Sequence, residues 1–251
     1  MLKRRIIPIE LLDGERLAKT VGFCASRDVG DPVKSSQVYS DQDADELVLL
    51  NIARADRNVT ALVAVVARIA RECFVPFTVG GGIRSLEDAA QLFSAGADKV
   101  LLNTTAYEQP GLITKIGDRY GKQAVVVGID VRATRTGFAV FSDCGRKQEA
   151  ISLSNHVSMV IAAGAGEIMI QSIDRDGTMT GYDLTLLQAV IAMSPVPVIA
   201  AGGAGDFIHL KQAFDVGADA AACGSLFNFG DNNPLRAKAF LKNYNIPFKR
   251  V

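Results

Sequence analysis

The two halves of the chain repeat one another. Three pairs of segments carry the repeat: Asp45–Val48 with Gly166–Met169, Thr78–Gly82 with Ala200–Gly205, and Gly96–Asp98 with Gly217–Asp219. The first and third pairs are each separated by 121 residues. Internal similarity at a fixed spacing indicates that the same structural unit occurs twice. We therefore expect two equivalent halves that pack against each other.

Short apolar runs alternate with amphipathic stretches from end to end, which is typical of βα units around a parallel sheet. Eight runs are predicted strands: Ile6–Ile9, Glu46–Ile52, Phe77–Val79, Lys99–Leu102, Ala124–Asp130, Glu167–Ser172, Val196–Ala201 and Ala220–Cys223. Between them lie helix-like stretches such as Ser85–Ser94 and Leu184–Met193, with apolar residues three and four positions apart. With 251 residues, the chain is predicted to form one α/β domain over residues 1–251. That domain is a (β/α)8 TIM barrel made of two half-barrels.

The stretch Arg132–Ala150 departs from this alternation. It places an apolar run, Phe138–Phe141, between Gly137 and the pair Cys144–Gly145. Glycines on both sides of a short apolar run indicate turns that join antiparallel strands. We predict a β-ribbon inserted after the fifth strand.

Charge and cysteine usage exclude several classes of protein. Lys plus Arg number 27 and Asp plus Glu number 27, without a block of like charge, so no nucleic-acid surface is indicated. Four scattered cysteines without CxxC spacing and only two histidines argue against a disulfide framework and a zinc site. No apolar run reaches the length of a membrane span, and no signal peptide is recognised. We expect a cytoplasmic protein that holds neither metal nor cofactor.

Each half carries a glycine cluster directly after a predicted strand, Gly80–Gly82 and Gly202–Gly205. Glycines leave backbone N–H groups uncovered, and the helix that follows adds the positive end of its dipole. Tight βα turns also use glycine, but the symmetric placement favours two phosphate-binding turns, here called the first and second cradle. A ligand with a phosphate at each end fits this arrangement.

Further donors follow the first, fourth, sixth and eighth strands. Lys19, after the first strand, is either an anion-binding residue or a solvated surface lysine. The predicted phosphate- and substrate-binding set is Lys19, Gly81, Gly82, Asn103, Thr104, Asp176, Gly177, Gly203, Ala204, Gly224 and Ser225. The carboxyl ends of parallel strands meet at one end of a barrel, so these residues are expected to surround one mouth.

Asp130 ends the long apolar run of the fifth strand and is the candidate catalytic residue. A carboxylate at the mouth of a barrel is partly desolvated, and the raised pKa that results suits general acid or base chemistry. The alternative is an aspartate that only caps the next turn. Asp174 and Asp176 share the loop after strand six, and the sequence does not rank them.

Ten segments spread over nearly the whole chain form a recognisable set: Ile6–Pro8, Gly30–Pro32, Asp45–Leu47, Thr78–Ile83, Gly96–Val100, Ile129–Asp130, Gly164–Ile168, Asp174–Thr178, Gly181–Asp183 and Gly202–Gly205. Together they resemble the cyclase subunit, HisF, of imidazole glycerol phosphate synthase. The resemblance implies a barrel that receives ammonia from a glutaminase subunit in a heterodimer. The ammonia reacts with a bis-phosphorylated ribulosyl-formimino-aminoimidazole carboxamide nucleotide. The products are imidazole glycerol phosphate and aminoimidazole carboxamide ribonucleotide.

The resemblance also implies two catalytic aspartates, one after strand one and one after strand five. Asp130 matches the second. At the first position the chain has Leu11 when counted without a gap, and Glu10 when counted with a gap of one residue. Side chains alternate along a strand, so these two residues are expected to face opposite sides. Glu10 is kept as a tentative catalytic residue.

The end of the barrel at which the strands begin, here called the lower end, matches the family more closely. In the family a ring of charged residues forms the gate to the ammonia passage, and Arg5, Glu46, Lys99 and Glu167 match that ring. Asp98 and Gln123 match positions that face the glutaminase. A charged ring also serves a purely structural purpose at the bottom of a barrel. We expect it to act in ammonia delivery.

Three functions are compatible with these residues. The first is the cyclase itself, with Glu10 in place of the missing aspartate. The second is a HisF-like paralogue that passes ammonia to another synthase, such as one that amidates surface sugars. The third is a regulatory subunit of a glutaminase that binds phosphate ligands without catalysis. A phosphate-handling isomerase of the same barrel type is disfavoured by the matched ring.

Overall fold

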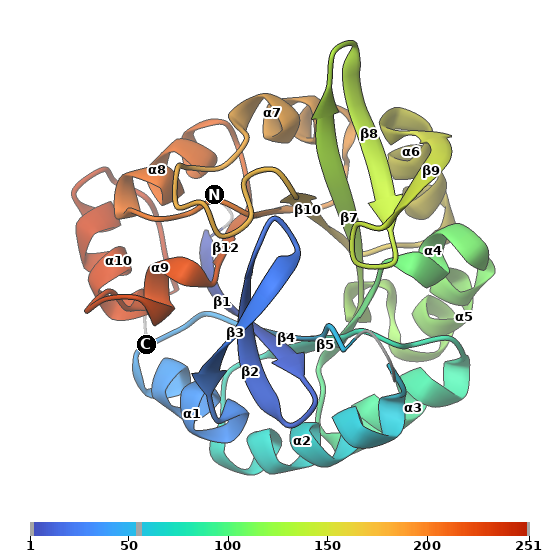
Figure 1. Ribbon diagram of the computed structural model, residues 1–251, viewed down its shortest axis with the longest axis horizontal. Coiled ribbons are helices and arrows are strands. Elements are labelled where there is room, and N and C mark those ends of the chain that lie inside the picture. The colour runs from blue at the N-terminus through green and yellow to red at the C-terminus, as the bar shows by residue number, and fades with distance from the viewer. Residues whose placement is uncertain (1–2, 54–56, 250–251) are drawn as a thin grey trace.

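Parallel strands close into a barrel at the centre of the molecule (Figure 1). The structure, a computed structural model, describes residues 3–53 and 57–249. Within these residues eight barrel strands follow one another around the ring: β1 (Arg5–Asp13), β4 (Leu47–Asn51), β5 (Phe77–Gly80), β6 (Lys99–Leu102), β7 (Val125–Thr134), β10 (Glu167–Ser172), β11 (Val198–Ala201) and β12 (Ala220–Cys223). Parallel pairing of β12 with β1, from Arg5 opposite Ala220 to Pro8 opposite Cys223, closes the ring. The predicted (β/α)8 barrel is confirmed.

Helices connect the strands and cover the outside of the barrel (Figure 1). The longer ones are α1 (Pro32–Asp41), α2 (Val59–Glu72), α3 (Leu86–Ala95), α5 (Gly111–Tyr120), α6 (Leu153–Ala163), α7 (Leu184–Met193), α8 (Phe207–Asp215) and α10 (Pro234–Lys242). Short turns of helix form α4 (Thr104–Glu108), α9 (Ser225–Asn228) and η1 (Lys122–Ala124). The predicted helices at Ser85–Ser94 and Leu184–Met193 are α3 and α7. In the described part of the chain, no helix is both long and apolar enough to cross a bilayer.

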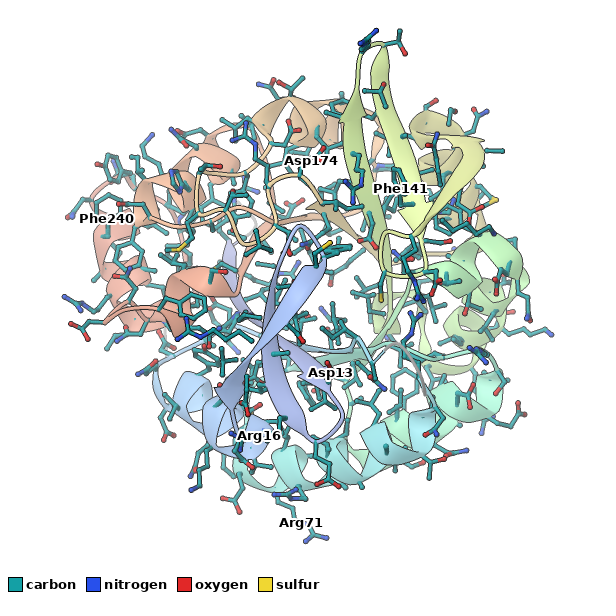
Figure 2. The ribbon with its side chains drawn as sticks, viewed as in Figure 1. Asp13, Arg16, Arg71, Phe141, Asp174 and Phe240 are labelled. Carbon is teal, nitrogen blue, oxygen red and sulfur yellow. The ribbon has the colours of Figure 1, made fainter. Side chains whose placement is uncertain are left out.

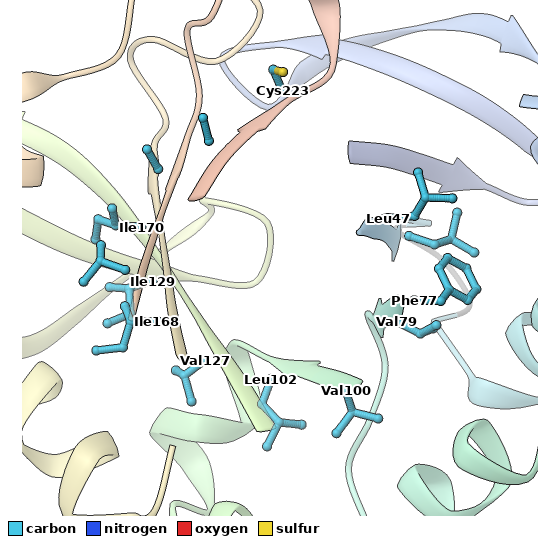
Figure 3. Close-up of a cluster of buried hydrophobic side chains, with 14 of the residues drawn as sticks. Leu47, Phe77, Val79, Val100, Leu102, Val127, Ile129, Ile168, Ile170 and Cys223 are labelled. Carbon is cyan, nitrogen blue, oxygen red and sulfur yellow. The ribbon is translucent and has the colours of Figure 1, made fainter. Parts of the chain in front are cut away.

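Both faces of the barrel strands are buried, which explains why the strands read as unbroken apolar runs. Along β7, Val125, Val127 and Ile129 point outward and pack beneath the helices, while Val126 points into the lumen. Figure 3 shows the outward set on several strands, including Leu47, Val100 and Ile168. Because side chains alternate, a shift of one residue in the register of a strand would move its lumen-facing side chains to the outer face and the reverse.

Two antiparallel hairpins extend from the mouth of the barrel. β7 continues past the ring to Thr134 and pairs with β8 (Gly137–Ser142), which pairs with β9 (Lys147–Ser152). This confirms the ribbon predicted within 132–150. The second hairpin, β2 (Arg16–Val21) with β3 (Cys24–Gly30), was not predicted, because neither strand forms an unbroken apolar run like those of the barrel. It crosses the centre of the ring when the barrel is viewed end-on (Figure 1).

Candidate functional site at the barrel mouth

A large cavity opens where the barrel strands end. It has a volume of about 1300 Å³ and continues down to Leu101 and Met169 in the lumen. Every residue of the predicted binding set lines it: Lys19, Gly81, Gly82, Asn103, Thr104, Asp176, Gly177, Gly203, Ala204, Gly224 and Ser225. Residues from distant parts of the chain thus meet at one site, as the βα arrangement requires. Their roles in binding stay predictions.

The first cradle follows β5. Gly81 and Gly82 have φ angles of 95° and 89°, a backbone conformation that side chains disfavour. A Cβ atom at Gly82 would come within 2.6 Å of the carbonyl oxygen of Arg57. Glycine is therefore needed here both for the turn and for the close approach of the neighbouring loop.

The second cradle follows β11 and repeats the first. Gly202 and Gly203 have φ angles of 84° and 112°, and a Cβ atom at Gly202 would come within 2.6 Å of the carbonyl oxygen of Ser172. The amide N–H of Gly205 is already bound, because it donates to Nδ1 of His209 at 3.2 Å. The backbone N–H groups nearer to β11, those of Gly202 and Gly203, are therefore the better candidates for binding an anion.

Asn103 and Gly224 precede the short helices α4 and α9 at equivalent places in the two halves. Asn103–Thr104 is here called the second arm of the first cradle, and Gly224–Ser225 the second arm of the second cradle. Neither Asn103 nor Gly224 caps its helix with a side-chain hydrogen bond. Instead the Asn103 amide turns toward the mouth and donates to Oδ2 of Asp130 at 3.0 Å and to the carbonyl of Gly128 at 3.1 Å. Thr104 Oγ1 accepts from the backbone N–H of Asp143 at 3.1 Å, which leaves its own proton for another acceptor.

Lys19 is buried within the site rather than solvated on the surface. It is 7% exposed, and Nζ donates to the carbonyl of Ile9 at 2.7 Å. Burial lowers the pKa of Lys19 to about 8, although the charges of Glu10 and Asp176 oppose this. A side chain on Gly224 would collide with Nζ, so the ammonium group lies against the second cradle.

Asp130 lies at the mouth, where β7 leaves the barrel. Burial, with the negative charge of Asp176, raises the pKa of Asp130 to about 7, and the hydrogen bond from Asn103 moderates the rise. A carboxyl group with such a pKa is present in both protonation states near neutral pH. This is the property that general acid or base catalysis requires.

Asp176 joins the unpredicted hairpin to the mouth. Its Oδ2 accepts from Thr20 Oγ1 at 2.9 Å and from the N–H of Phe23 at 3.3 Å, and its Oδ1 accepts from Gln171 at 3.2 Å. Asp176 lines the cavity, whereas Asp174 bonds the N–H of Ala133 on the outer side of β7. The structure thus separates two aspartates that the sequence left equal.

Glu10 lies outside the cavity, contrary to its tentative place in the catalytic set. Its side chain is 2% exposed beneath α1, where Oε2 accepts from Ser36 Oγ at 2.5 Å. Leu11 lines the cavity instead, continuing the inward series of Ile7 and Ile9. No bulge interrupts the pairing of β1 with β4 between Ile9 and Leu12. Strand β1 therefore presents a leucine at the mouth, and we do not retain Glu10 as a catalytic residue.

The four predicted gate residues meet at the lower end of the barrel. Arg5 donates to Glu46 at 2.8 Å and to Glu167 at 2.6 Å, and Lys99 Nζ contacts the same two carboxylates at 2.9 and 2.6 Å. Burial opposes the ionisation of Glu167, but Arg5 and Lys99 outweigh it and hold the pKa of Glu167 below its usual value. These four side chains form a ring of alternating charge at the lower end of the lumen, here called the floor. Its role as a gate stays a prediction.

Asp98 and Gln123 lie at the same lower end. Asp98 Oδ2 accepts from the N–H of Phe77 at 2.8 Å, and Gln123 Nε2 donates to the carbonyl of Tyr120 at 3.2 Å. Both bonds hold turns that lead into barrel strands. These contacts do not test whether the two residues face a partner.

Several cavity residues were missed at the sequence level, notably Asp13, Arg57, Asp143 and Cys144. Figure 2 places Asp13 near the centre of the ring of helices, seen from the mouth. Asp13 and Arg57 follow the carboxyl ends of β1 and β4, a position that can be read from the sequence. Asp143 and Cys144 reach the cavity through the β8–β9 turn, which could not be positioned in advance. Among the described residues, no group of three or more His, Cys, Asp and Glu side chains could hold a metal ion.

Comparison with known proteins agrees with this architecture. Residues 5–233 match the model of the family described as histidine biosynthesis protein. The chain belongs to that family. Three relatives are each called imidazole glycerol phosphate synthase subunit HisF. The relative from Exiguobacterium sp. (strain ATCC BAA-1283 / AT1b) is 40% identical over 251 residues, which cover 100% of this chain and 98% of the relative. Those from Streptomyces coelicolor and Caulobacter vibrioides (strain NA1000 / CB15N) are 42% and 43% identical, over 98% and 99% of this chain and 98% and 97% of the relatives. The suspected resemblance to HisF is confirmed.

The buried Glu10 carboxyl is expected to make stability depend on pH. Burial raises the pKa of Glu10 from 4.5 to about 7, although Ser35, Ser36 and Lys19 favour the charged form. The folded protein therefore keeps a proton that the unfolded chain releases between these pH values, and stability falls as pH rises through this range. Between pH 4.5 and 8 the wild type should lose about 3 kcal/mol relative to Glu10→Gln.

Urea unfolding at several pH values measures this loss, and Glu72→Gln on the exposed face of α2 is the control. Equal pH dependence in the wild type and Glu10→Gln would contradict the buried, proton-holding carboxyl.

Asp130 should titrate near pH 7. The two neighbours that perturb it act in opposite directions: Asn103→Ala removes a donor to the charged form and should raise the pKa further, while Asp176→Asn removes a like charge and should lower it. Carboxyl carbon shifts of 13C-labelled aspartate, followed by NMR against pH, measure the midpoint. A midpoint near 4 in the wild type, or shifts of the same sign in both variants, would refute this account of Asp130.

Proposed function

We propose that the protein acts as the HisF-type cyclase subunit of an imidazole glycerol phosphate synthase. It would take ammonia from a glutaminase partner and use it to convert the bis-phosphorylated ribulosyl-formimino-aminoimidazole carboxamide nucleotide. The products would be imidazole glycerol phosphate and aminoimidazole carboxamide ribonucleotide. One observation carries the proposal: Asp130 shares a single cavity with two glycine cradles, one from each half of the barrel.

The two cradles suit a ligand that carries a phosphate at each end. Gly82 and Gly203 come from opposite halves of the barrel and line the same cavity. Backbone N–H groups at such turns bind phosphate oxygens, and buried cations strengthen the attraction. A ligand held at both ends places its middle near the centre of the mouth. Asp130 is then close to the reacting atoms.

The barrel lumen supports delivery of ammonia from below. Between the charged floor and the mouth, the lumen is lined by apolar side chains, among them Ile7, Val48, Val126 and Met169. Such a lining favours neutral ammonia over ammonium, because a charge in apolar surroundings is strongly unfavourable. We infer that a glutaminase subunit docks on the lower face, near Asp98 and Gln123, and releases ammonia at the floor formed by Arg5, Glu46, Lys99 and Glu167.

A second candidate function has one observation in its favour. At the position that carries a catalytic aspartate in the family pattern, β1 presents Leu11 to the cavity, and a leucine cannot transfer a proton. A barrel that keeps the ammonia route but lacks this carboxylate suits a HisF-like subunit that supplies ammonia to another synthase. The two functions differ in whether the nucleotide is consumed.

The cyclase reaction can be tested in the isolated subunit. We expect the isolated subunit, given the bis-phosphorylated nucleotide and a high concentration of ammonium salt, to form imidazole glycerol phosphate, because free ammonia bypasses the glutaminase. Asp130→Asn should lower the rate by about a hundredfold or more, since it removes a general acid or base. Product formation is followed by chromatography.

The matched control is Asp174→Asn, which changes an aspartate that lies outside the cavity. Binding of the nucleotide without turnover would contradict the cyclase function and support delivery of ammonia to another synthase. Absence of binding would contradict the cyclase function.

The role of the charged floor as a gate can be tested by a substitution at Lys99. Lys99→Ala removes one of the two cations that join Glu46 to Glu167, so the floor should no longer control the passage of ammonia. In the complex with its glutaminase, more glutamate should form per product than in the wild type, while phosphate affinity stays the same. Lys211→Ala, at an exposed ion pair with Asp215, is the control. An unchanged ratio of glutamate to product in Lys99→Ala would argue against the gate.

A further inference from the structure

The side chain of Arg57 reaches across one side of the mouth. Arg57 follows β4, and its guanidinium group pairs with Asp143 and donates to Sγ of Cys144 at 3.3 Å, both in the turn between β8 and β9. The arginine side chain is 17% exposed, although it lines an open cavity. It therefore forms part of the cavity wall.

Both partners of the Arg57–Asp143 ion pair contact the first cradle. At one end the carbonyl of Arg57 lies so close to Gly82 that a Cβ atom there would approach it to 2.6 Å. At the other end the backbone N–H of Asp143 donates to Thr104 Oγ1 at 3.1 Å. Gly82 and Thr104 belong to the two arms of the cradle, so the Arg57–Asp143 ion pair joins the loop beside one arm to the turn beside the other.

Asp143 does not depend on Arg57 for charge balance. Arg146 also pairs with it, at 2.9 Å, and the hydrogen bonds from Arg146 and Arg57 hold the pKa of Asp143 below its usual value despite partial burial. The side chain of Asp143 is 36% exposed, and an ion pair with a hydrated carboxylate contributes little. A phosphate dianion held by backbone amides offers the planar guanidinium group a stronger, bidentate partner.

The second cradle has a cation in the corresponding role. Lys19 Nζ lies against Gly224, the second arm of that cradle, and the lysine is 7% exposed. Arg57 and Lys19 thus supply one buried cation to each end of the cavity. They come from different βα loops, so the half-barrel repeat does not account for the pairing.

We propose that Arg57 is a phosphate-binding residue of the first cradle, and that Asp143 holds its guanidinium group in place until a phosphate dianion replaces the carboxylate. The inference deepens the proposed function and rests on phosphate binding at Gly82. It adds a cation to the first cradle, which would then hold one of the ligand's two dianionic phosphomonoester groups. A ligand that lacks a charge at that end would leave Arg57 on Asp143.

Titration with inorganic phosphate tests the proposal, with the backbone amide signals of Gly82 and Gly203 followed by 15N NMR. Each glycine reports on its own cradle. Arg57→Ala should weaken phosphate binding at Gly82 about tenfold or more, the usual effect of losing a charged hydrogen bond, and leave Gly203 within about twofold. Arg57→Lys, which keeps the charge, should restore part of the affinity at Gly82.

Two further variants separate Arg57 from its ion pair. Asp143→Asn removes the competing carboxylate charge and should tighten phosphate binding at Gly82. Arg146→Ala removes the other cation that pairs with Asp143 and does not line the cavity, so Asp143 should hold Arg57 more firmly, phosphate binding at Gly82 should weaken and binding at Gly203 should not change. If Arg57→Ala fails to fold, the affinity of Asp143→Asn for phosphate at Gly82 still tests the proposal.

The outcomes distinguish the inference from the function on which it rests. Wild-type shifts at Gly82 that persist unchanged in Arg57→Ala would overturn the role of Arg57 and leave the phosphate cradle intact. Weaker binding in Asp143→Asn would overturn the exchange between carboxylate and phosphate. If phosphate shifts neither glycine in the wild type, the proposed function fails and the inference fails with it.

Discussion

Closure of the sheet by the pairing of β1 with β12 is the constraint on which the rest of the structure depends. In a closed barrel each strand has one face toward the lumen and one toward the helices, and no edge remains to absorb a change of register. A residue's place in the strand therefore decides whether it meets apolar lumen, charged floor, cavity or helix. The chemistry at both ends of the barrel follows from this alternation.

The two residues at the end of β1 show what such a constraint makes predictable. The sequence predicted that Glu10 and Leu11 face opposite sides but left open which faced the mouth, because a gap of one residue changed the answer. The regular pairing of β1 with β4 decides it: Leu11 continues the inward series, and Glu10 packs under α1. The Glu10 carboxyl group is therefore buried away from the cavity, and β1 presents a leucine at this place in the mouth.

Sequence reasoning was accurate where periodicity and strand ends determine position. The eight strands and both glycine turns fall into this class, because strand starts and strand ends collect at opposite ends of the barrel. The four charged residues of the floor were identified through the resemblance to the family, and the structure brings them together. It was weakest for the β2–β3 hairpin, which packs through Thr20 and Phe23 on a single carboxylate, Asp176, some 150 residues later in the chain. The pairing of β2 with β1 and β3 is local, but contacts of that longer range leave no pattern in the sequence, so the position of the hairpin over the mouth could not be predicted. The place of Asp143 beside Arg57 depends on a contact of the same kind.

The half-barrel repeat and the cations of the mouth serve different purposes. The repeat produces two backbone cradles with equivalent glycine geometry, and on their own they would bind a ligand with two phosphates in either direction. Lys19 reaches its cradle from the β2–β3 hairpin, while Arg57 reaches the other from the loop after β4. An ammonium group and a planar guanidinium group differ in geometry and hydration. If the two cradles bind phosphate as proposed, the ligand's two ends would meet different surroundings, and a nearly symmetric cavity could hold an unsymmetric molecule in one direction, with a fixed face toward Asp130.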